Sequence, residues 1–222
     1  MKIYYKKIAF LLLFCTTAVF AFSQKSLSLN LGFDYNSENF TEDDYSRDQY
    51  IFSISGSFYY FPENFPLGLF TKLSFGIASL RDEKNPRESM EARDCTVTEI
   101  RVVLSPSFKI KLGSSVHIPI SLGPFFFYSH ERCSENNLWP PGIYKSHSYH
   151  ALNLGLILDV PIVFRVSGSF FVKPGVMFNW GFLRAEKGVM WMNYRTTHND
   201  SFKTTPFYSL GFGFYIGFGW DL

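Results

Sequence analysis

The sequence predicts an all-β fold, an eight-stranded antiparallel up-and-down barrel that crosses a membrane with its strands. Three observations predict it: a closing stretch with strict period-two alternation, connections that are alternately long and short, and a balanced hydropathy. Hydrophobic residues make up 46% of the chain, yet its mean hydropathy is 0.00. A barrel with one apolar and one polar face gives such an average, whereas a bundle of membrane helices would be more hydrophobic.

The closing stretch, residues 207–222, shows the alternation most clearly. Large apolar or aromatic side chains occupy every even position from Tyr208 to Leu222, and the odd positions are small or polar apart from Tyr215 and Phe207. A period of two gives a strand with two unlike faces. A soluble protein rarely ends on so apolar an edge strand, because that edge would pair with other chains. A closed barrel in lipid has no free edge.

Seven further stretches alternate in the same way. The predicted strands are residues 26–36, 50–60, 67–79, 95–109, 116–128, 149–165, 170–183 and 207–222. The predicted long loops are residues 37–49, 80–94, 129–148 and 184–204, and the remaining connections are short turns. In an up-and-down barrel, alternate connections lie at opposite ends, so all four long loops share one end. Tilted strands of this length are long enough to cross the hydrocarbon layer.

Aromatic residues gather near both ends of these strands, as expected at two membrane boundaries. The belt at the short-turn end contains Tyr60, Phe61, Phe65, Phe164, Phe170 and Trp220. The belt at the long-loop end contains Tyr35, Tyr50, Phe126, Tyr128, Trp180 and Tyr208. The alternative is that these aromatics pack a soluble core.

The chain begins with the pattern of a secretory signal peptide. Three lysines among the first seven residues precede an apolar core, and small residues before Gln24 offer a cleavage site. We expect residues 1–23 to be the signal peptide and residues 24–222 to form the barrel domain. A lipoprotein acylated at Cys15 is the alternative, although bulky Phe14 stands where a small residue is expected.

Cys95 and Cys133 are the two cysteines of the mature chain. An even pair in an exported chain permits a disulfide. Cys95 opens the predicted fourth strand at the long-loop end, and Cys133 lies just beyond the same end of the fifth. The two residues are within reach of each other if the third long loop folds back. Two unpaired thiols are the alternative.

Six charged residues fall on the polar, inward phase of the predicted strands. An eight-stranded barrel is just wide enough inside for its own side chains, so buried charges must pair with one another. Lys72 and Glu99 lie on neighbouring strands, as do Asp159 and Lys173. An ion-paired plug is favoured over a narrow channel for small solutes. The predicted interior ion pairs involve Asp34, Lys72, Glu99, Arg101, Asp159 and Lys173.

The signal peptide, the eight alternating strands, the long loops and the closing strand together resemble the small outer-membrane barrels of the OmpA-barrel and OmpX type. The resemblance covers the mature chain as a pattern rather than as a residue motif. It implies a place in the bacterial outer membrane, with the membrane lipid as a partner and the loops exposed at the cell surface. It also implies that the barrel-assembly machinery reads the closing strand at Phe214, Ile216, Phe218, Trp220 and Leu222. The family usually ends in Phe, and Leu222 departs from this.

The sequence contains no cofactor, metal or phosphate-binding motif, and the near-neutral mature chain gives no reason to expect nucleic acid as a partner. We expect no enzymatic activity. The expected role is structural or surface-interactive, through an extracellular ligand that the long loops contact. The acidic first loop from Glu38 to Asp48 and the aromatic third loop with Leu138, Trp139 and Tyr144 are the predicted contact surfaces.

Two other classes remain as alternatives. Some small barrels modify lipid A with Ser, His and an acid near the outer rim. Here the run from Ser146 to His150 leads into the sixth strand, and the run from Ser129 to Glu131 follows the fifth, with no spacing diagnostic of a nucleophile and base. A secreted lipocalin-type barrel would place its apolar residues inside and its charges outside, the reverse of the pattern in this sequence.

Overall fold

The computed structural model describes residues 23–40, 45–63, 65–82, 93–136, 144–192, 195–205 and 207–222. Every regular element in these ranges is a β-strand. No helix among the described residues is long and apolar enough to cross a membrane. The predicted signal peptide, apart from Ser23, lies outside the described residues, so the boundary between residues 23 and 24 stays a prediction.

Ten strands follow one another along the described part of the chain. They are β1 (Ser23–Phe40), β2 (Tyr45–Pro62), β3 (Leu67–Asp82), β4 (Arg93–Lys111), β5 (Val116–Asn136), β6 (Tyr144–Pro161), β7 (Val163–Ser167), β8 (Phe170–Met192), β9 (Arg195–Thr205) and β10 (Phe207–Asp221). β7 continues β6 after Ile162, since both pair with β5 on one side and β8 on the other. Within the described ranges, β9 pairs only with β8.

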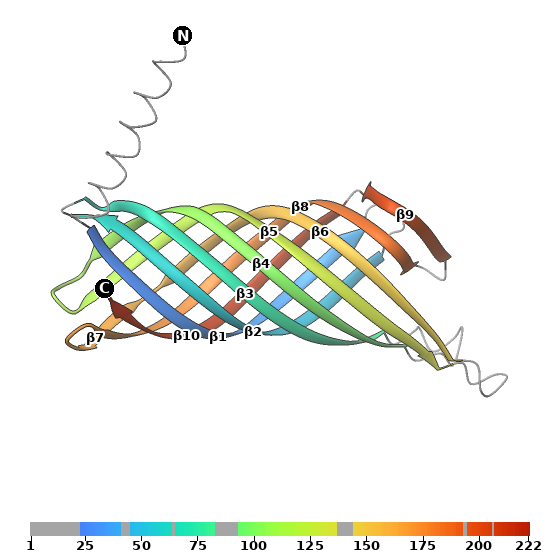
Figure 1. Cartoon of the computed structure of the whole chain (residues 1–222), viewed down its shortest axis with the longest axis horizontal. Coiled ribbons are helices and arrows are strands. Elements are labelled where there is room, and N and C mark those ends of the chain that lie inside the picture. The colour runs from blue at the N-terminus through green and yellow to red at the C-terminus, as the bar shows by residue number, and fades with distance from the viewer. Residues whose placement is uncertain are drawn as a thin grey trace, which may run out of the picture.

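The sheet closes into a barrel because β10 pairs antiparallel with both β1 and β8. With β9 set aside as a side arm, nine of the described strands form the wall, and they make eight staves because β6 and β7 together count as one. The predicted eight-stranded antiparallel barrel is therefore confirmed. Figure 1 shows the tilted strands, with the C-terminus and β7 at one end and the β8–β9 hairpin at the other.

The strands are longer than the alternation predicted. β1 and β2 stay paired from Asn36–Gln49 out to Phe40–Tyr45, through most of the predicted first long loop. β5 and β6 stay paired out to Asn136–Tyr144, through most of the third. Polar residues do not end a strand when the neighbouring strand continues to satisfy its backbone groups. We call the strand residues that lie within the four predicted long loops the collar. It comprises residues 37–40, 45–49, 80–82, 93–94, 129–136, 144–148, 184–192 and 195–204.

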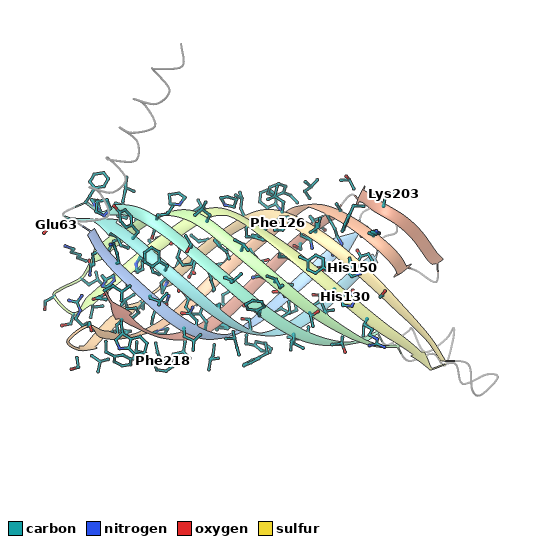
Figure 2. All side chains as sticks on the ribbon, viewed as in Figure 1. Glu63, Phe126, His130, His150, Lys203 and Phe218 are labelled. Carbon is teal, nitrogen blue, oxygen red and sulfur yellow. The ribbon has the colours of Figure 1, made fainter. Side chains whose placement is uncertain are left out.

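The two faces of the wall carry the side chains that the alternation assigned to them. In β1, Leu27, Leu29 and Leu31 are exposed while Ser28 and Asn30 are buried. Phe126 and Phe218, both labelled in Figure 2, are likewise exposed on the outer face. The outer surface is thus apolar, and the charged side chains at the middle of the strands face inward, as predicted.

One residue of the predicted aromatic belts is an exception. Phe61 is only 3% exposed, because it shares the inward face of β2 with Tyr59. Its ring stacks on the ring of Tyr59 inside the barrel, with the two centroids 6.1 Å apart. Phe65, Phe170 and Trp220 lie at that end as expected, and Phe170 packs against Trp220.

Candidate functional site

The barrel interior brings together all six predicted charged residues, and each of them is buried. We call them the middle cluster. Within it, Arg101 contacts two carboxylates. Its Nη2 lies 2.9 Å from Oε1 of Glu99, and its Nη1 lies 3.8 Å from Oδ2 of Asp34. The guanidinium also lies over the rings of Phe125 and Phe127, at 5.7 and 5.8 Å from their centroids.

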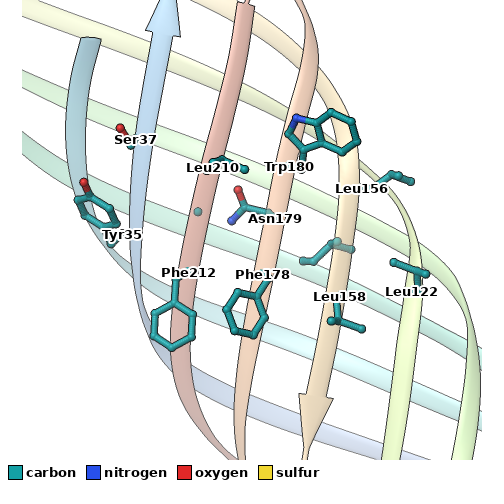
Figure 3. A pocket seen from close by; sticks show the side chains of 12 residues that line it. Tyr35, Ser37, Leu122, Leu156, Leu158, Phe178, Asn179, Trp180, Leu210 and Phe212 are labelled. Carbon is teal, nitrogen blue, oxygen red and sulfur yellow. The ribbon is translucent and has the colours of Figure 1, made fainter.

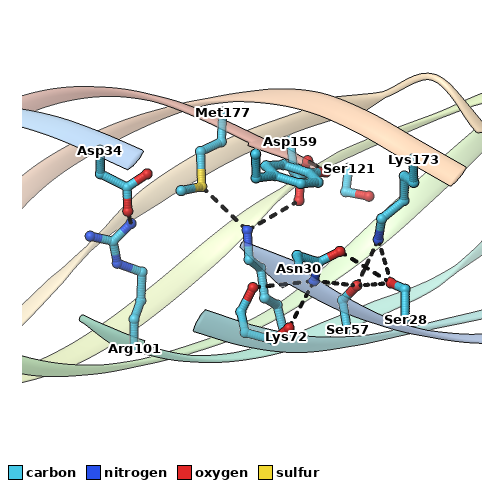
Figure 4. A network of polar contacts seen from close by, with 12 residues as sticks. Ser28, Asn30, Asp34, Ser57, Lys72, Arg101, Ser121, Asp159, Lys173 and Met177 are labelled. Atoms are coloured by element: carbon cyan, nitrogen blue, oxygen red, sulfur yellow. Dashed lines mark hydrogen bonds and ion pairs between the residues drawn. The ribbon is translucent and has the colours of Figure 1, made fainter. Parts of the chain in front are cut away.

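Lys72 reaches across the lumen instead of pairing with Glu99. Its Nζ lies 4.0 Å from Oδ2 of Asp159, 3.5 Å from Sδ of Met177 and 4.3 Å from the ring centroid of Tyr215 (Figure 4). The Tyr215 hydroxyl donates to Asp159 at 2.5 Å. Asp159 is therefore held from two sides, by a cation and by a hydroxyl.

Lys173 binds hydroxyls rather than a carboxylate. Its Nζ donates to Oγ of Ser28 and Oγ of Ser57, both at 2.7 Å, and those two oxygens are 2.7 Å apart (Figure 4). Asn30 adds contacts to the same serine group. A polar cradle therefore surrounds an ammonium that has no carboxylate in direct contact among the described residues.

The strand register explains why these charges do not pair between neighbouring strands. Lys72 does not meet Glu99, and Asp159 does not meet Lys173. Glu99 stands opposite Gly76, four residues along β3 from Lys72. Asp159 stands opposite Met177, four residues along β8 from Lys173. Each offset is about 13 Å along a strand, at roughly 3.3 Å per residue. In a narrow tilted barrel, side chains on opposite walls lie closer than these neighbours.

A second buried ionic group, which we call the outer cluster, consists of Glu38, Gln49, Tyr149, Arg184 and Glu186. Arg184 Nη1 lies 3.3 Å from Oε1 of Glu38, its Nε lies 3.2 Å from Oε2 of Glu186, and its Nη2 lies 2.6 Å from Oη of Tyr149. Gln49 Nε2 donates to the other oxygen of Glu38 at 2.9 Å, and Tyr149 donates to Glu186.

The outer cluster was missed because residues 37–49 and 184–204 were predicted to be loops. The pairing of β6 with β8 shifts between Leu154 and Gly155, which leaves Phe182 as an extra residue. Phe182 and Leu183 both face outward, and the alternation resumes with Arg184 inward. The sequence did contain a signal for this bulge. Phe182 and Leu183 are two consecutive apolar residues, and the charged Arg184 and Glu186 follow them. Glu38 is accordingly not part of an exposed acidic loop, which corrects that prediction.

Aromatic and aliphatic side chains fill the space between the ionic groups. The buried apolar cluster consists of Tyr59, Phe61, Phe70, Val103, Phe125, Phe127, Ile157 and Met177.

The residues considered for lipid A chemistry do not assemble. Ser129 is buried on the inward face of β5, and Glu131 shares that phase, whereas Ser148 and His150 face outward on β6. The barrel wall thus separates the acid from the histidine. Leu138 and Trp139 of the predicted aromatic loop lie outside the described residues, and Tyr144 begins β6.

The cysteines lie where the strands β4 and β5 run past the predicted loop boundary. Cys95 is buried and disulfide-bonded. Cys133 stands directly opposite it in the register of β4 and β5. The side chain of Cys133 is outside the described part of the structure, so Cys133 as the partner of Cys95 stays a prediction.

The outer surface of the barrel holds a groove of about 640 Å³ across β1, β5, β6, β8 and β10 (Figure 3). Most of its lining side chains are apolar and face outward. No group of three or more His, Cys, Asp or Glu able to hold a metal occurs among the described residues. The outward lining of the groove includes Leu122, Leu156, Leu158, Phe178, Trp180, Leu210 and Phe212.

The barrel matches solved structures, although no family model and no curated protein sequence matches the chain. A major outer membrane protein from Thermus thermophilus aligns with a TM-score of 0.52 and 13% identity, covering 90% of this chain and 99% of that one. The chain has the fold of a small outer-membrane β-barrel.

Two further outer-membrane barrels are similar at lower TM-scores. Neisserial surface protein A aligns at 0.44 with 12% identity, over 86% of this chain and 95% of that one. Ail of Yersinia pestis, in complex with the heparin analogue sucrose octasulfate, aligns at 0.42 with 12% identity, over 89% and 99%. At such identities the likeness concerns the fold alone.

Proposed function

We propose that this chain is an integral protein of the bacterial outer membrane with a structural and surface-contact role. The apolar outer wall anchors it in lipid, and the collar meets an extracellular ligand at the cell surface. The observation that carries the proposal is the contrast between a filled lumen and strands that continue beyond the apolar surface at one end only.

The filled lumen argues against transport as the main task. Arg101, Lys173 and Arg184 are each at most 2% exposed and all are engaged in hydrogen bonds or ion pairs. Opening a path would separate these charges from their partners in a poorly solvated interior. Breaking a buried ion pair by removing one partner typically costs about 3–5 kcal/mol, so spontaneous opening would be rare.

The collar is a preformed contact surface, because its backbone stays in the sheet. Its ladders run continuously from the membrane wall through β1–β2, β4–β5 and β5–β6. Asp48, Arg132 and Lys187 are exposed on its outer side. A rigid surface loses less conformational entropy on binding than a free loop would, which favours contact through the collar.

Assembly in the outer membrane fits the closing strand. Phe214, Ile216, Phe218 and Trp220 are all more than 40% exposed on the lipid side of β10, and Leu222 follows them at 73%. We propose the membrane lipid and the barrel-assembly machinery as the partners of this face. The inward residues of the same strand are mostly glycines, which leave room for Asn30, Asp34 and Asn36 in the lumen.

The β8–β9 hairpin permits a direct test of surface contact. β10 pairs with β8 only up to Gly181, and β6 pairs with it up to Gly188. Replacing residues 189–203 by Asn-Gly therefore leaves all pairs of the closed wall in place. Cells displaying this variant should retain the folded barrel and lose attachment to the glycan- or protein-coated surface that cells displaying the parent chain bind.

The matched control replaces residues 112–115, the short turn at the opposite end, by Asn-Gly. This control should attach as the parent chain does. Equal attachment by parent, hairpin variant and cells without the protein, over a panel of coated surfaces, would refute the surface-contact role. Ion conductance through the purified barrel in planar bilayers would instead favour the channel.

A further inference from the structure

Three donor side chains converge on the outer surface of the barrel at the boundary between the apolar wall and the collar. Tyr128 and His130 are two residues apart on β5, and His150 stands directly opposite His130 on β6. His150 Nδ1 lies 3.2 Å from Nδ1 of His130 and 2.6 Å from Oη of Tyr128. Figure 2 shows both histidines on the same part of the wall.

We propose that His130 and His150 chelate a divalent transition-metal ion of the copper, nickel and zinc class through their Nδ1 atoms, with the Tyr128 hydroxyl hydrogen-bonded to His150 beside them. Imidazole nitrogen is a preferred ligand of these three ions. The proposed site goes beyond the surface-contact role: it lies at the base of the collar, and its test does not depend on attachment.

The separation of the two nitrogens matches that of two adjacent ligands on one ion. Metal–nitrogen bonds of about 2.0–2.1 Å place two neighbouring ligand nitrogens about 2.8–3.0 Å apart in square-planar geometry and about 3.3–3.4 Å apart in tetrahedral geometry. The observed 3.2 Å lies between these values, close to the tetrahedral one. The register fixes this pairing, because a directly opposed cross-strand pair keeps its side chains close.

The contacts of His150 also suggest that its ring nitrogen is shared. One ring nitrogen offers either a single N–H or a single lone pair, yet Nδ1 of His150 contacts both a hydroxyl and a second imidazole. A hydrogen-bonded network without metal is the alternative arrangement. An ion between the two imidazoles would instead let each direct its own lone pair at one centre.

The neighbours on both sides of the pair have opposite effects. Thr98 stands opposite His130 and donates its hydroxyl to the His130 carbonyl at 3.3 Å, which steadies that strand. Lys187 stands opposite His150. Its positive charge repels a bound cation. Replacing Lys187 by Gln should therefore tighten metal binding.

The test uses the full mature chain, without an affinity tag, refolded in detergent micelles. Titration with Cu²⁺ should show one bound ion per barrel, and its electron paramagnetic resonance spectrum should show coupling to two nitrogens. His130→Asn and His150→Asn should each weaken Cu²⁺ binding by at least about tenfold, the scale of losing a group that supports a metal. Tyr128→Phe should weaken it less. His117→Asn, at the other end of β5, is the matched control and should change nothing.

Heat-modifiable migration verifies that each variant is folded. The proposal is overturned if the folded parent chain binds neither Cu²⁺ nor Zn²⁺. It is equally overturned if the His130→Asn/His150→Asn double variant binds Cu²⁺ as the parent does, because the ion then sits elsewhere. Binding of inorganic phosphate at these residues in place of metal would show a cationic anion site and also contradict it.

Discussion

The middle and outer clusters both hold buried charges in a narrow lumen, but the charges are paired differently in the two clusters. The middle cluster spreads its charges over several strands, and its Lys72–Asp159 contact is a loose 4.0 Å. The outer cluster gathers two carboxylates and a phenol around the single guanidinium of Arg184, with contacts of 2.6–3.3 Å. Guanidinium presents five donors in a fixed plane, whereas ammonium is a compact point charge.

From this difference we expect each residue of the outer cluster to contribute more to the free energy of unfolding than each residue of the middle cluster. Loss of Arg184 leaves two buried carboxylates without their shared cation, each with a single neutral donor, Gln49 or Tyr149. Loss of Lys72 leaves only one carboxylate, Asp159, with the Tyr215 hydroxyl still in contact. Four sequence changes, ordered by expected effect, would break or sharpen this comparison.

The largest effect is expected from inserting one alanine between Leu183 and Arg184. The inserted residue would take the next inward position, so Arg184 and Glu186 would turn outward. The outer cluster would be lost as a unit, and the yield of folded barrel, measured by heat-modifiable migration after refolding, should fall severely. Phe182→Ala keeps the residue count and should refold normally. Equal yields from the two variants would contradict the role of the bulge.

Arg184→Met should come next. It leaves Glu38 and Glu186 buried without their common partner, at a cost of about 3–5 kcal/mol in the free energy of unfolding. Guanidinium titration of the barrel in lipid vesicles measures this loss. Adding Glu38→Gln and Glu186→Gln to Arg184→Met should restore part of it, because both unpaired charges are then removed. A triple variant no more stable than Arg184→Met would count against electrostatics as the cause.

Cys95→Ser tests the constraint that lies beside the outer cluster. A Cys95–Cys133 bridge would close a long loop, and its loss should lower the free energy of unfolding by about 2–4 kcal/mol under non-reducing conditions. Peptide mapping of the unreduced parent chain should find the two cysteines in one linked fragment. Separate fragments would show that Cys133 is not the partner.

The smallest effect is expected from Lys72→Met, at about 1–3 kcal/mol, the cost of leaving one buried polar group less satisfied. The same titration in vesicles measures it. Val103→Ala, on the same inward layer but without charge, provides the control for lost packing volume. If Lys72→Met proved more costly than Arg184→Met, the comparison of the two clusters would be reversed.

The alternation in the sequence was sufficient for the wall and for the inward direction of the middle cluster. Leu29 outward and Lys72 inward follow from a period of two, which every antiparallel strand obeys. The partners inside the lumen were not predictable in this way. Lys72 meets Asp159 because strand stagger and tilt bring residues of opposite walls together. The stagger is a property of the closed barrel and cannot be predicted from the sequence of any one strand.

The outer cluster was unpredictable from alternation for a separate reason. Glu38 lies in a polar segment that continues as strand because its neighbour β2 continues, a tertiary effect rather than a local one. Arg184 lies after the bulge at Phe182, where counting by two gives the wrong face. Both features occur where the chain leaves the lipid, since only there does polarity cease to mark the inward face.

The central claim is that apolar side chains of this barrel face lipid while its charges are enclosed. The most direct measurement is nuclear Overhauser transfer from lipid acyl chains to isoleucine methyl groups of the barrel in bicelles, which needs no substitution. Ile54 and Ile216 are 46% and 43% exposed, whereas Ile51 and Ile157 are at most 1% exposed. The account predicts transfer from acyl chains to Ile54 and Ile216 and none to Ile51 and Ile157. Transfer to the second pair, or water contact at the first, would contradict it.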